Sequence, residues 1–179
     1  MIKWLLVTLV AGIALLLWRM TAIAKRNLPG AGDAAPDFSL PDQNGRTRTA
    51  GEFRGRWLVL YFYPRDDTPG CTEQAAQYRD AMRGIEALGA VVCGASVDDS
   101  KSHAAFARRY NLPFALLADR KGETAARYGS LLDLGVVKFA RRNTFLIDPQ
   151  GKVSKVYLGA NPSRNAQDVI EDLKRLAAK

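Results

Sequence analysis

The sequence predicts an α/β domain with a central mixed β-sheet flanked by helices. Strand-like apolar runs alternate along the chain with segments whose apolar residues recur at helical spacing, as in strand–helix–strand units. Near the end, two strand-like runs flank Pro149-Gln150-Gly151, which predicts an antiparallel hairpin and therefore a mixed sheet. The 179 residues, 47% hydrophobic and 25% charged, suit one such domain and exclude a disordered chain.

The first predicted strand is the most apolar part of the domain. Residues 57–63 (WLVLYFY) form a continuous aromatic and β-branched run, typical of a strand that is buried on both faces. Apolar residues then recur at helical spacing over 72–88, and Gly89 is a natural stop after a helix. Residues 90–97 (AVVCGASV) predict a second buried strand, so these segments form one strand–helix–strand unit.

The middle of the chain continues the alternation. Asp99 or Ser100 can cap a helix that runs to about Tyr110. A short strand at 114–118 (FALLA) and a short helix at 122–128 follow. Because crossovers between parallel strands are right-handed, the loop after the first strand lies at the carboxyl edge of the sheet, where ligand sites collect.

The last third predicts the hairpin and a closing helix. The hairpin strands are 143–148 and 152–158, on either side of the Pro-x-Gly turn. Residues 165–178 have the apolar spacing of an amphipathic helix. The sheet is therefore expected to be covered on both faces.

An apolar segment precedes the domain. Residues 4–18 carry no charge and lie between Lys3 and Arg19. As a helix this run spans roughly 22 Å, and it reaches the thickness of a hydrocarbon core, about 30 Å, only if it extends to residue 24. We expect a single-pass anchor in a bacterial inner membrane, with the domain on the periplasmic side. The expected divisions are an anchor or signal sequence at 1–26, a flexible tether at 27–34 and a domain at 35–179.

Two other interpretations of this segment stay open. Lys3, the apolar run and Ala22-Ile23-Ala24 resemble a secretory signal peptide, whose cleavage would release a secreted or periplasmic protein. A buried core helix is disfavoured because the run has no polar face.

Charge and cysteine content exclude two classes of function. The net charge is +8, and Lys3, Arg19, Lys25 and Arg26 supply half of it within the first 26 residues, which contain no acid. The remaining surplus is dispersed, so nucleic-acid binding is not indicated. Two cysteines and one histidine cannot form a four-ligand Cys/His zinc site.

Cys71 is the candidate nucleophile. It follows the polar loop after the first strand and the Pro69-Gly70 turn, at the start of the next helix. Unpaired backbone N–H groups and the positive end of the helix dipole favour a thiolate there, and the thiolate is the reactive form of cysteine. A buried, inert cysteine is the alternative, but structural cysteines seldom follow a polar turn.

The loop resembles the active-site loop of peroxiredoxins. Pro64, Thr68 and Cys71 match the motif P-x-x-x-T-x-x-C, and FYPRDDTPGCTEQ is similar to the bacterioferritin-comigratory (PrxQ) subfamily of the AhpC/TSA superfamily. The similarity extends to two further segments. APDFSLPDQNG at 35–45 resembles the opening hairpin of the subfamily, and NTFLIDPQGKV at 143–153 resembles its late hairpin. It covers about residues 35–179 and implies a thioredoxin-like fold.

The resemblance assigns roles to four residues. Cys71 would be the peroxidatic cysteine, which attacks a peroxide oxygen and becomes a sulfenic acid. Thr68 would orient the peroxide and the thiolate, and Pro64 would shield the sulfur from solvent. Arg142 would stabilise the thiolate and hold the peroxide. A register slip of one residue would give that role to Arg141.

The implied enzyme is a thiol-dependent peroxidase that protects against oxidative stress. Its substrates would be hydrogen peroxide or alkyl hydroperoxides, and the chemistry requires no metal or organic cofactor. The usual resolving position of the subfamily is occupied by Ala76, and Cys93 lies within a predicted core strand. We therefore expect a one-cysteine mechanism with thioredoxin, glutaredoxin or a small thiol as the external reductant.

Three other features depart from the family pattern or lack an assigned role. Gln74 replaces the acid that usually fixes the arginine, and Glu73 could substitute for it. Residues 129–140 are apolar for a connection and could cover the site, form an interface, touch the membrane or pack on the core. The single histidine, His103, is expected on the surface or packed from its helix, because a thiolate needs no base.

Two rival functions remain. A thioredoxin-like disulfide oxidoreductase needs a C-x-x-C motif, and this chain has Thr68 in place of the first cysteine. A membrane-tethered redox sensor would be oxidised once without turnover.

Overall fold

The computed structural model of the chain describes residues 12 and 28–177. Its strands are β1 (Ser39–Pro41), β2 (Thr47–Thr49), β3 (Trp57–Phe62), β4 (Ala90–Ser96), β5 (Ala115–Ala118), β6 (Leu131–Asp133), β7 (Lys138–Ala140), β8 (Thr144–Ile147) and β9 (Val153–Tyr157). Its helices are the 3₁₀ turn η1 (Ala50–Phe53), α2 (Pro69–Ala87), α3 (Ser100–Tyr110), α4 (Glu123–Arg127) and α5 (Asn165–Leu176).

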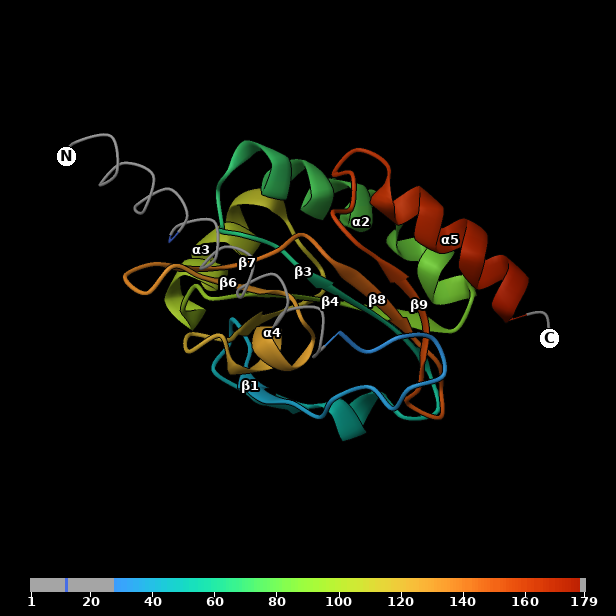
Figure 1. Cartoon of the computed structure of the whole chain (residues 1–179). Coiled ribbons are helices and arrows are strands. Elements are labelled where there is room, and N and C mark those ends of the chain that lie inside the picture. Colours follow the sequence, from blue (N-terminus) through green and yellow to red (C-terminus); the bar gives the residue numbers. More distant parts are fainter. Residues whose placement is uncertain (1–11, 13–27, 178–179) are drawn as a thin grey trace.

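A five-stranded mixed sheet forms the centre of the domain, in the order β5-β4-β3-β8-β9. β3, β4 and β5 run parallel, while β8 pairs antiparallel with both β3 and β9. In Figure 1, α2 and α5 lie on one face of the sheet, and β1 and α4 lie on the other. This arrangement confirms the predicted fold class.

The strand β3 is buried on both faces, as its composition predicts. Val59 and Tyr61 enter the core beneath α2 and α5, whereas Leu58, Leu60 and Phe62 enter the core beneath β1, η1 and α4. Such a strand contributes to two hydrophobic cores, which makes the end of β3 a rigid base for the loop that follows it.

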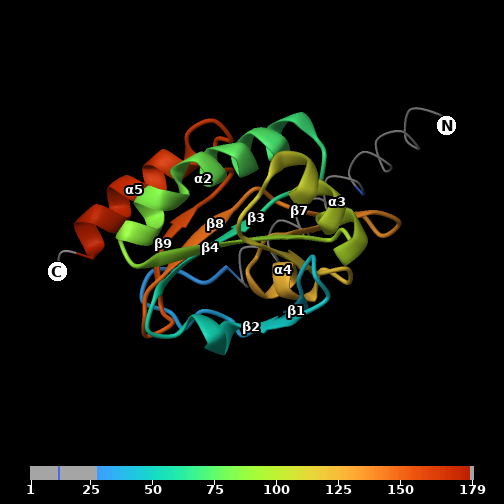
Figure 2. The same ribbon diagram turned by 180° about the vertical axis from the view of Figure 1, so that it is seen from behind.

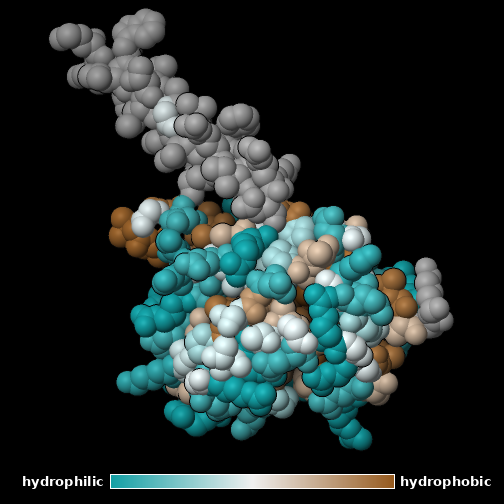
Figure 3. Space-filling view, turned by 90° about the horizontal axis from the view of Figure 1, so that it is seen from below, coloured by the Kyte–Doolittle hydropathy of each residue, from teal (hydrophilic) through white to brown (hydrophobic). Residues whose placement is uncertain are grey.

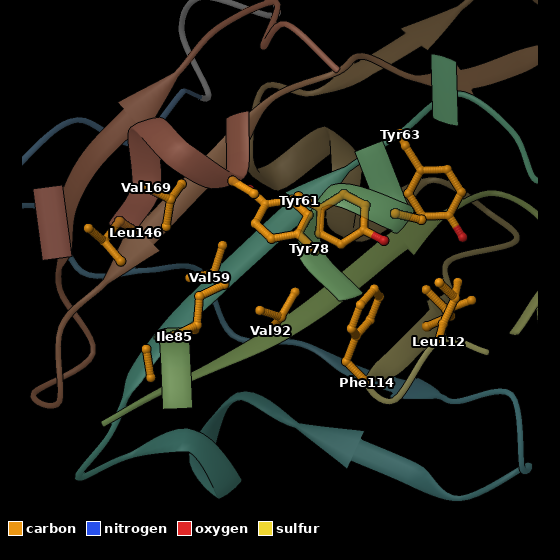
Figure 4. Close-up of a cluster of buried hydrophobic side chains, with 14 of the residues drawn as sticks. Val59, Tyr61, Tyr63, Tyr78, Ile85, Val92, Leu112, Phe114, Leu146 and Val169 are labelled. Carbon is orange, nitrogen blue, oxygen red and sulfur yellow. The ribbon is translucent and has the colours of Figure 1, made fainter. Parts of the chain in front are cut away.

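The core beneath α2 is rich in stacked tyrosines (Figure 4). The ring of Tyr61 stacks on those of Tyr63 and Tyr78, with centroids 5.5 and 4.8 Å apart. Gly94 on β4 makes room for this cluster, because a Cβ atom there would lie 2.7 Å from the Tyr61 ring. The cluster adjoins Cys71, which belongs to the same buried set.

α2 begins earlier than the sequence pattern predicts. The expected start is residue 72, and the observed start is Pro69, with Thr68 as the extended N-cap residue. Proline suits the first turn of a helix because its missing N–H would have no partner there. Cys71 is consequently the third residue of α2.

Part of the predicted tether is attached to the domain. The backbone N–H of Gly32 donates to the carbonyl of Val153, and that of Val153 donates to Asp33, at 2.8 and 2.9 Å. Residues 32–34 therefore continue along the edge of the sheet beside β9, which local composition did not reveal.

The apolar connection at 129–140 forms a hairpin. β6 and β7 pair antiparallel, and its turn exposes Leu134, Val136 and Val137. Figure 2 shows β7 and α3 at the same end of the domain. The face seen in Figure 3 is mainly hydrophilic, so these exposed apolar side chains stand out from the general surface.

The predicted anchor lies almost entirely outside the described residues, which include only residue 12 of the segment 4–24. Among residues 12 and 28–177, no helix combines the length and apolar character that crossing a bilayer requires.

Candidate active site

The loop between β3 and α2 places Cys71 at a buried helix N-terminus. Thr68 has the extended backbone of an N-cap residue, with φ −82° and ψ 146°, and the first helical hydrogen bond runs from the Thr72 N–H to its carbonyl. The Cys71 side chain is only 1% exposed. A sulfur in the first turn of a helix lies near its unpaired N–H groups, which favour an anion.

Arg142 reaches Cys71 from the segment between β7 and β8. Its Nη2 lies 3.4 Å from the Cys71 Sγ. Its Nη1 donates to the Gly70 carbonyl at 3.3 Å and to the Gln74 Oε1 at 2.8 Å. The guanidinium is thus held on the first turn of α2, with one of its N–H groups directed at the sulfur.

Gly70 permits this close approach. A Cβ atom at Gly70 would lie 3.2 Å from the Arg142 Nη2 and 3.5 Å from a carbon of Pro162. The first distance is tighter than most Cβ contacts and the second is ordinary van der Waals contact, so a side chain at this position would require the guanidinium to shift by a few tenths of an ångström. The sequence pattern identifies Gly70 only as part of the Pro69-Gly70 turn.

The other two predicted site residues, Pro64 and Thr68, lie on the loop before Cys71, and neither side chain hydrogen-bonds to the sulfur as Arg142 does. Pro64 is half-buried just after β3, and the Thr68 hydroxyl donates to the Arg65 carbonyl at 3.0 Å. The neighbouring Arg141 has a buried Nε that hydrogen-bonds to none of the described residues. The structure therefore brings together Cys71 and Arg142, with Thr68 one turn away at the helix N-cap.

Gln74 orients Arg142 with the help of Asn165, a residue that no sequence pattern singles out. The Gln74 Nε2 donates to the Asn165 Oδ1 at 2.9 Å, which fixes the amide so that its oxygen faces Arg142. The same Oδ1 accepts hydrogen bonds from the hydroxyls of Tyr78 at 2.6 Å and Thr144 at 2.7 Å. Glu73, expected as a substitute for the missing acid, is exposed.

Asn165 therefore connects α2, β8 and α5 behind the site. It is 1% exposed, as the first residue of α5. Its role depends on contacts with residues far away in the sequence, so only the folded chain identifies it.

Replacing Asn165 with alanine is expected to lower the free energy of unfolding by about 2–4 kcal/mol, because buried donors on Gln74, Tyr78 and Thr144 lose their shared acceptor. Chemical denaturation measures the change. The matched control is Asn44→Ala at an exposed turn position, which should change stability by less than about 0.5 kcal/mol. Equal effects of the two substitutions would contradict the role given to Asn165.

A second buried polar cluster holds the loop between β3 and α2 against α3. The Asp66 carboxylate accepts hydrogen bonds from the Tyr63 hydroxyl at 2.8 Å and the Ser102 hydroxyl at 2.7 Å, and it contacts the His103 Nδ1 at 2.9 Å. Burial opposes ionisation, but the hydrogen bonds from His103, Ser102 and Tyr63 lower the pKa of Asp66 below its usual value. His103, expected on the surface or packed from its helix, is completely buried.

Cys93 occupies the opposite face of the sheet from Cys71. On β4, Cys93 and Ala95 enter the core beneath β1 and α4, whereas Val92 enters the core that contains Cys71. Burial raises the pKa of the Cys93 thiol to about 12. Both cysteines are free thiols, and the sheet separates them.

Comparison with known proteins agrees with this geometry. The sequence profile of the AhpC/TSA family matches residues 31–156. The chain is 41% identical to the putative peroxiredoxin bcp of Coxiella burnetii, over 78% of this chain and 95% of the relative. It is 39% identical to the chloroplastic peroxiredoxin Q of Populus jackii, over 87% of this chain and 72% of the relative. The crystal structure of peroxidoxin BcpB from Mycobacterium tuberculosis superposes with a TM-score of 0.79 at 32% identity, covering 83% of this chain and 98% of BcpB.

The comparison corrects the predicted localisation. The relatives are named as chloroplastic peroxiredoxin Q and as a bacterial bcp protein. Neither name describes a membrane protein, so the comparison does not support the prediction of a chain held in a membrane by residues 4–24. The physical weakness of that prediction is the length of the uncharged run, roughly 22 Å as a helix.

The residues that the family profile matches, 31–156, include both Cys71 and Arg142. Peroxiredoxins reduce peroxides with a cysteine thiolate and are regenerated by thiols. The chain therefore belongs to the AhpC/TSA family, within its PrxQ and bcp peroxiredoxins, and is a thiol peroxidase.

Proposed function

We propose that Cys71 carries out the peroxidase reaction by a one-cysteine mechanism in which Arg142 is its electrostatic partner. The observation that carries this proposal is the 3.4 Å contact between the Arg142 Nη2 and the Cys71 Sγ at the N-terminus of α2. A fixed guanidinium and a helix N-terminus both stabilise negative charge, first on sulfur and then on the departing oxygen.

The first step is the attack of the Cys71 thiolate on one peroxide oxygen. A sulfur–oxygen bond forms as the oxygen–oxygen bond breaks, which oxidises the sulfur to sulfenic acid and reduces the leaving oxygen. The leaving oxygen takes up a proton and departs as water or an alcohol. Arg142 stabilises the charge that develops on this oxygen.

Thr68 and Pro64 are proposed to shape the peroxide site. The Thr68 hydroxyl lies at the N-cap of the helix that carries Cys71, and rotation away from the Arg65 carbonyl would allow it to donate to a bound peroxide. Pro64 begins the loop and presents an apolar, half-buried surface. These two residues would orient the peroxide and limit the access of water to the sulfur.

An external thiol is proposed to complete the cycle. The first thiol attacks the sulfenic sulfur, expels water and forms a mixed disulfide. A second thiol releases the reduced Cys71 and leaves the reductant as a disulfide. Cys93 is an unsuitable resolving group because it faces the other core and because burial raises the pKa of its thiol to about 12.

Mass spectrometry after treatment with one equivalent of peroxide tests this mechanism. We expect a stable sulfenic acid at Cys71, captured by a sulfenate trap, and an unmodified Cys93. The variant Cys93→Ala should give the same product. A stoichiometric Cys71–Cys93 disulfide would contradict the one-cysteine mechanism while leaving the peroxidase activity itself intact.

A further inference from the structure

Asp66 ties the active-site loop to the body of the protein. It lies midway between Pro64 and Thr68, and its side chain is 3% exposed. Its carboxylate faces α3 through Ser102 and His103, and its backbone N–H donates to the Asp98 Oδ2 at 2.9 Å. Both the side chain and the main chain of this loop residue are therefore held by the segment that begins α3.

The backbone beside Asp66 needs such support. Asp67 adopts a φ of 56°, in the left-handed region that residues other than glycine seldom occupy. Such a conformation persists when the surrounding contacts determine it. The buried hydrogen bonds of Asp66 hold the backbone immediately before Asp67.

The ring of His103 has hydrogen-bond acceptors at both nitrogens. Its Nδ1 lies 2.9 Å from the Asp66 Oδ2, and its Nε2 lies 3.2 Å from the Leu117 carbonyl on β5. A carbonyl cannot donate, and the Asp66 carboxylate is ionised because its hydrogen bonds lower its pKa. A neutral ring would leave one bare nitrogen facing an oxygen, so the contacts fit the imidazolium, which donates from both nitrogens.

The groups around the ring are consistent with a positive charge. Asp66 faces it from the loop, and Asp99 stands at the N-cap of its own helix, α3. The end of β3 contributes the hydroxyl of Tyr63, 3.3 Å from the Nδ1, which donates to Asp66. Because the His103 side chain is completely buried, its charge needs the pairing with Asp66.

We propose that His103 is a positioning residue for the peroxidase reaction: held as an imidazolium, it fixes Asp66 and, through Asp66, the loop between Pro64 and Thr68. This inference rests on the proposed role of that loop at Cys71. His103 touches no reacting atom and acts through Asp66 alone.

The protonation of His103 can be measured without reference to activity. It is the only histidine in the chain, so ¹⁵N-labelled imidazole signals need no assignment by mutation. Near neutral pH, both ring nitrogens of the wild-type protein are expected to carry protons. In Asp66→Asn the ring should become a neutral tautomer. A neutral ring in the wild-type protein would overturn the proposal.

Kinetics test the positioning role. In His103→Gln, the rate constant for oxidation of Cys71 by peroxide is expected to fall about 10–100-fold, because small displacements of a catalytic geometry have effects of this size. Alkylation of Cys71 by a haloacetamide, which needs the thiolate but no oriented peroxide, should change far less. The double variant with Asp66→Asn should be no slower than either single variant, since both break the same contact.

The control is Phe106→Leu on the same helix, a buried residue that contacts the tyrosine core and forms no polar interaction with the loop. It should lower thermal stability and preserve the peroxide rate. The proposal fails if His103→Gln keeps the full peroxide rate, or if Phe106→Leu slows the peroxide reaction as much as His103→Gln does. Failure of Cys71 as the nucleophile would instead appear as activity retained in Cys71→Ser, whatever the state of His103.

Discussion

Replacing Cys71 with serine is expected to abolish peroxide turnover, with a loss of at least about a thousandfold that leaves only background activity. A serine hydroxyl is not ionised near neutral pH and cannot form a sulfenic acid, so neither the guanidinium nor the helix N-terminus has an anion to stabilise. The substitution changes one atom in a side chain that is 1% exposed, so the fold should persist. Peroxide consumption coupled to a thiol reductant measures the loss.

The matched control for this variant is Cys93→Ala. It removes the other thiol of the chain, also 1% exposed, from the core beneath β1 and α4. Turnover with an external thiol is expected to stay within about twofold of wild type, with a modest loss of stability from the smaller side chain. Full activity in Cys71→Ser, or loss of turnover in Cys93→Ala, would contradict the roles assigned to the two cysteines.

Replacing Arg142 with glutamine is expected to lower the second-order rate constant for peroxide by about 10²–10³. A reduction of this size is typical when one preorganised donor to a developing anion is removed. The neutral amide can still donate a hydrogen bond, but it lacks the charge and the fork of N–H groups that joins Gly70, Gln74 and the sulfur. Stopped-flow measurement of peroxide reduction under single-turnover conditions isolates this step.

Arg141→Gln is the control, because it removes the same charge from the adjacent residue. Arg141 is not hydrogen-bonded to the sulfur, and its loss should change the rate constant by less than about threefold. Lysine at position 142 should restore only part of the rate, since an ammonium lacks the planar fork. An Arg141→Gln variant that is slower than Arg142→Gln would show that the register inferred for this segment is wrong.

Patterns confined to one segment were sufficient to predict the main elements. The run at 57–63 became β3, since its continuous apolar side chains can be buried only in a strand covered on both faces. The spacing at 165–178 became α5, because that helix has a single apolar face. The hairpin β6–β7 was missed because its strands have three residues each and lack a clear alternation of polar and apolar side chains.

The chain by itself determined the fold class, the place of Cys71 after β3 and the family that its loop resembles, because these depend on local spacing and on a contiguous motif. Only the tertiary structure decided which arginine reaches the sulfur and that Gln74 is held by Asn165, since those contacts join residues roughly 70–90 positions apart. It also decided that the sheet separates Cys93 from Cys71. Successive residues of a strand point to opposite faces, and which face packs on which helices is set only when the sheet assembles.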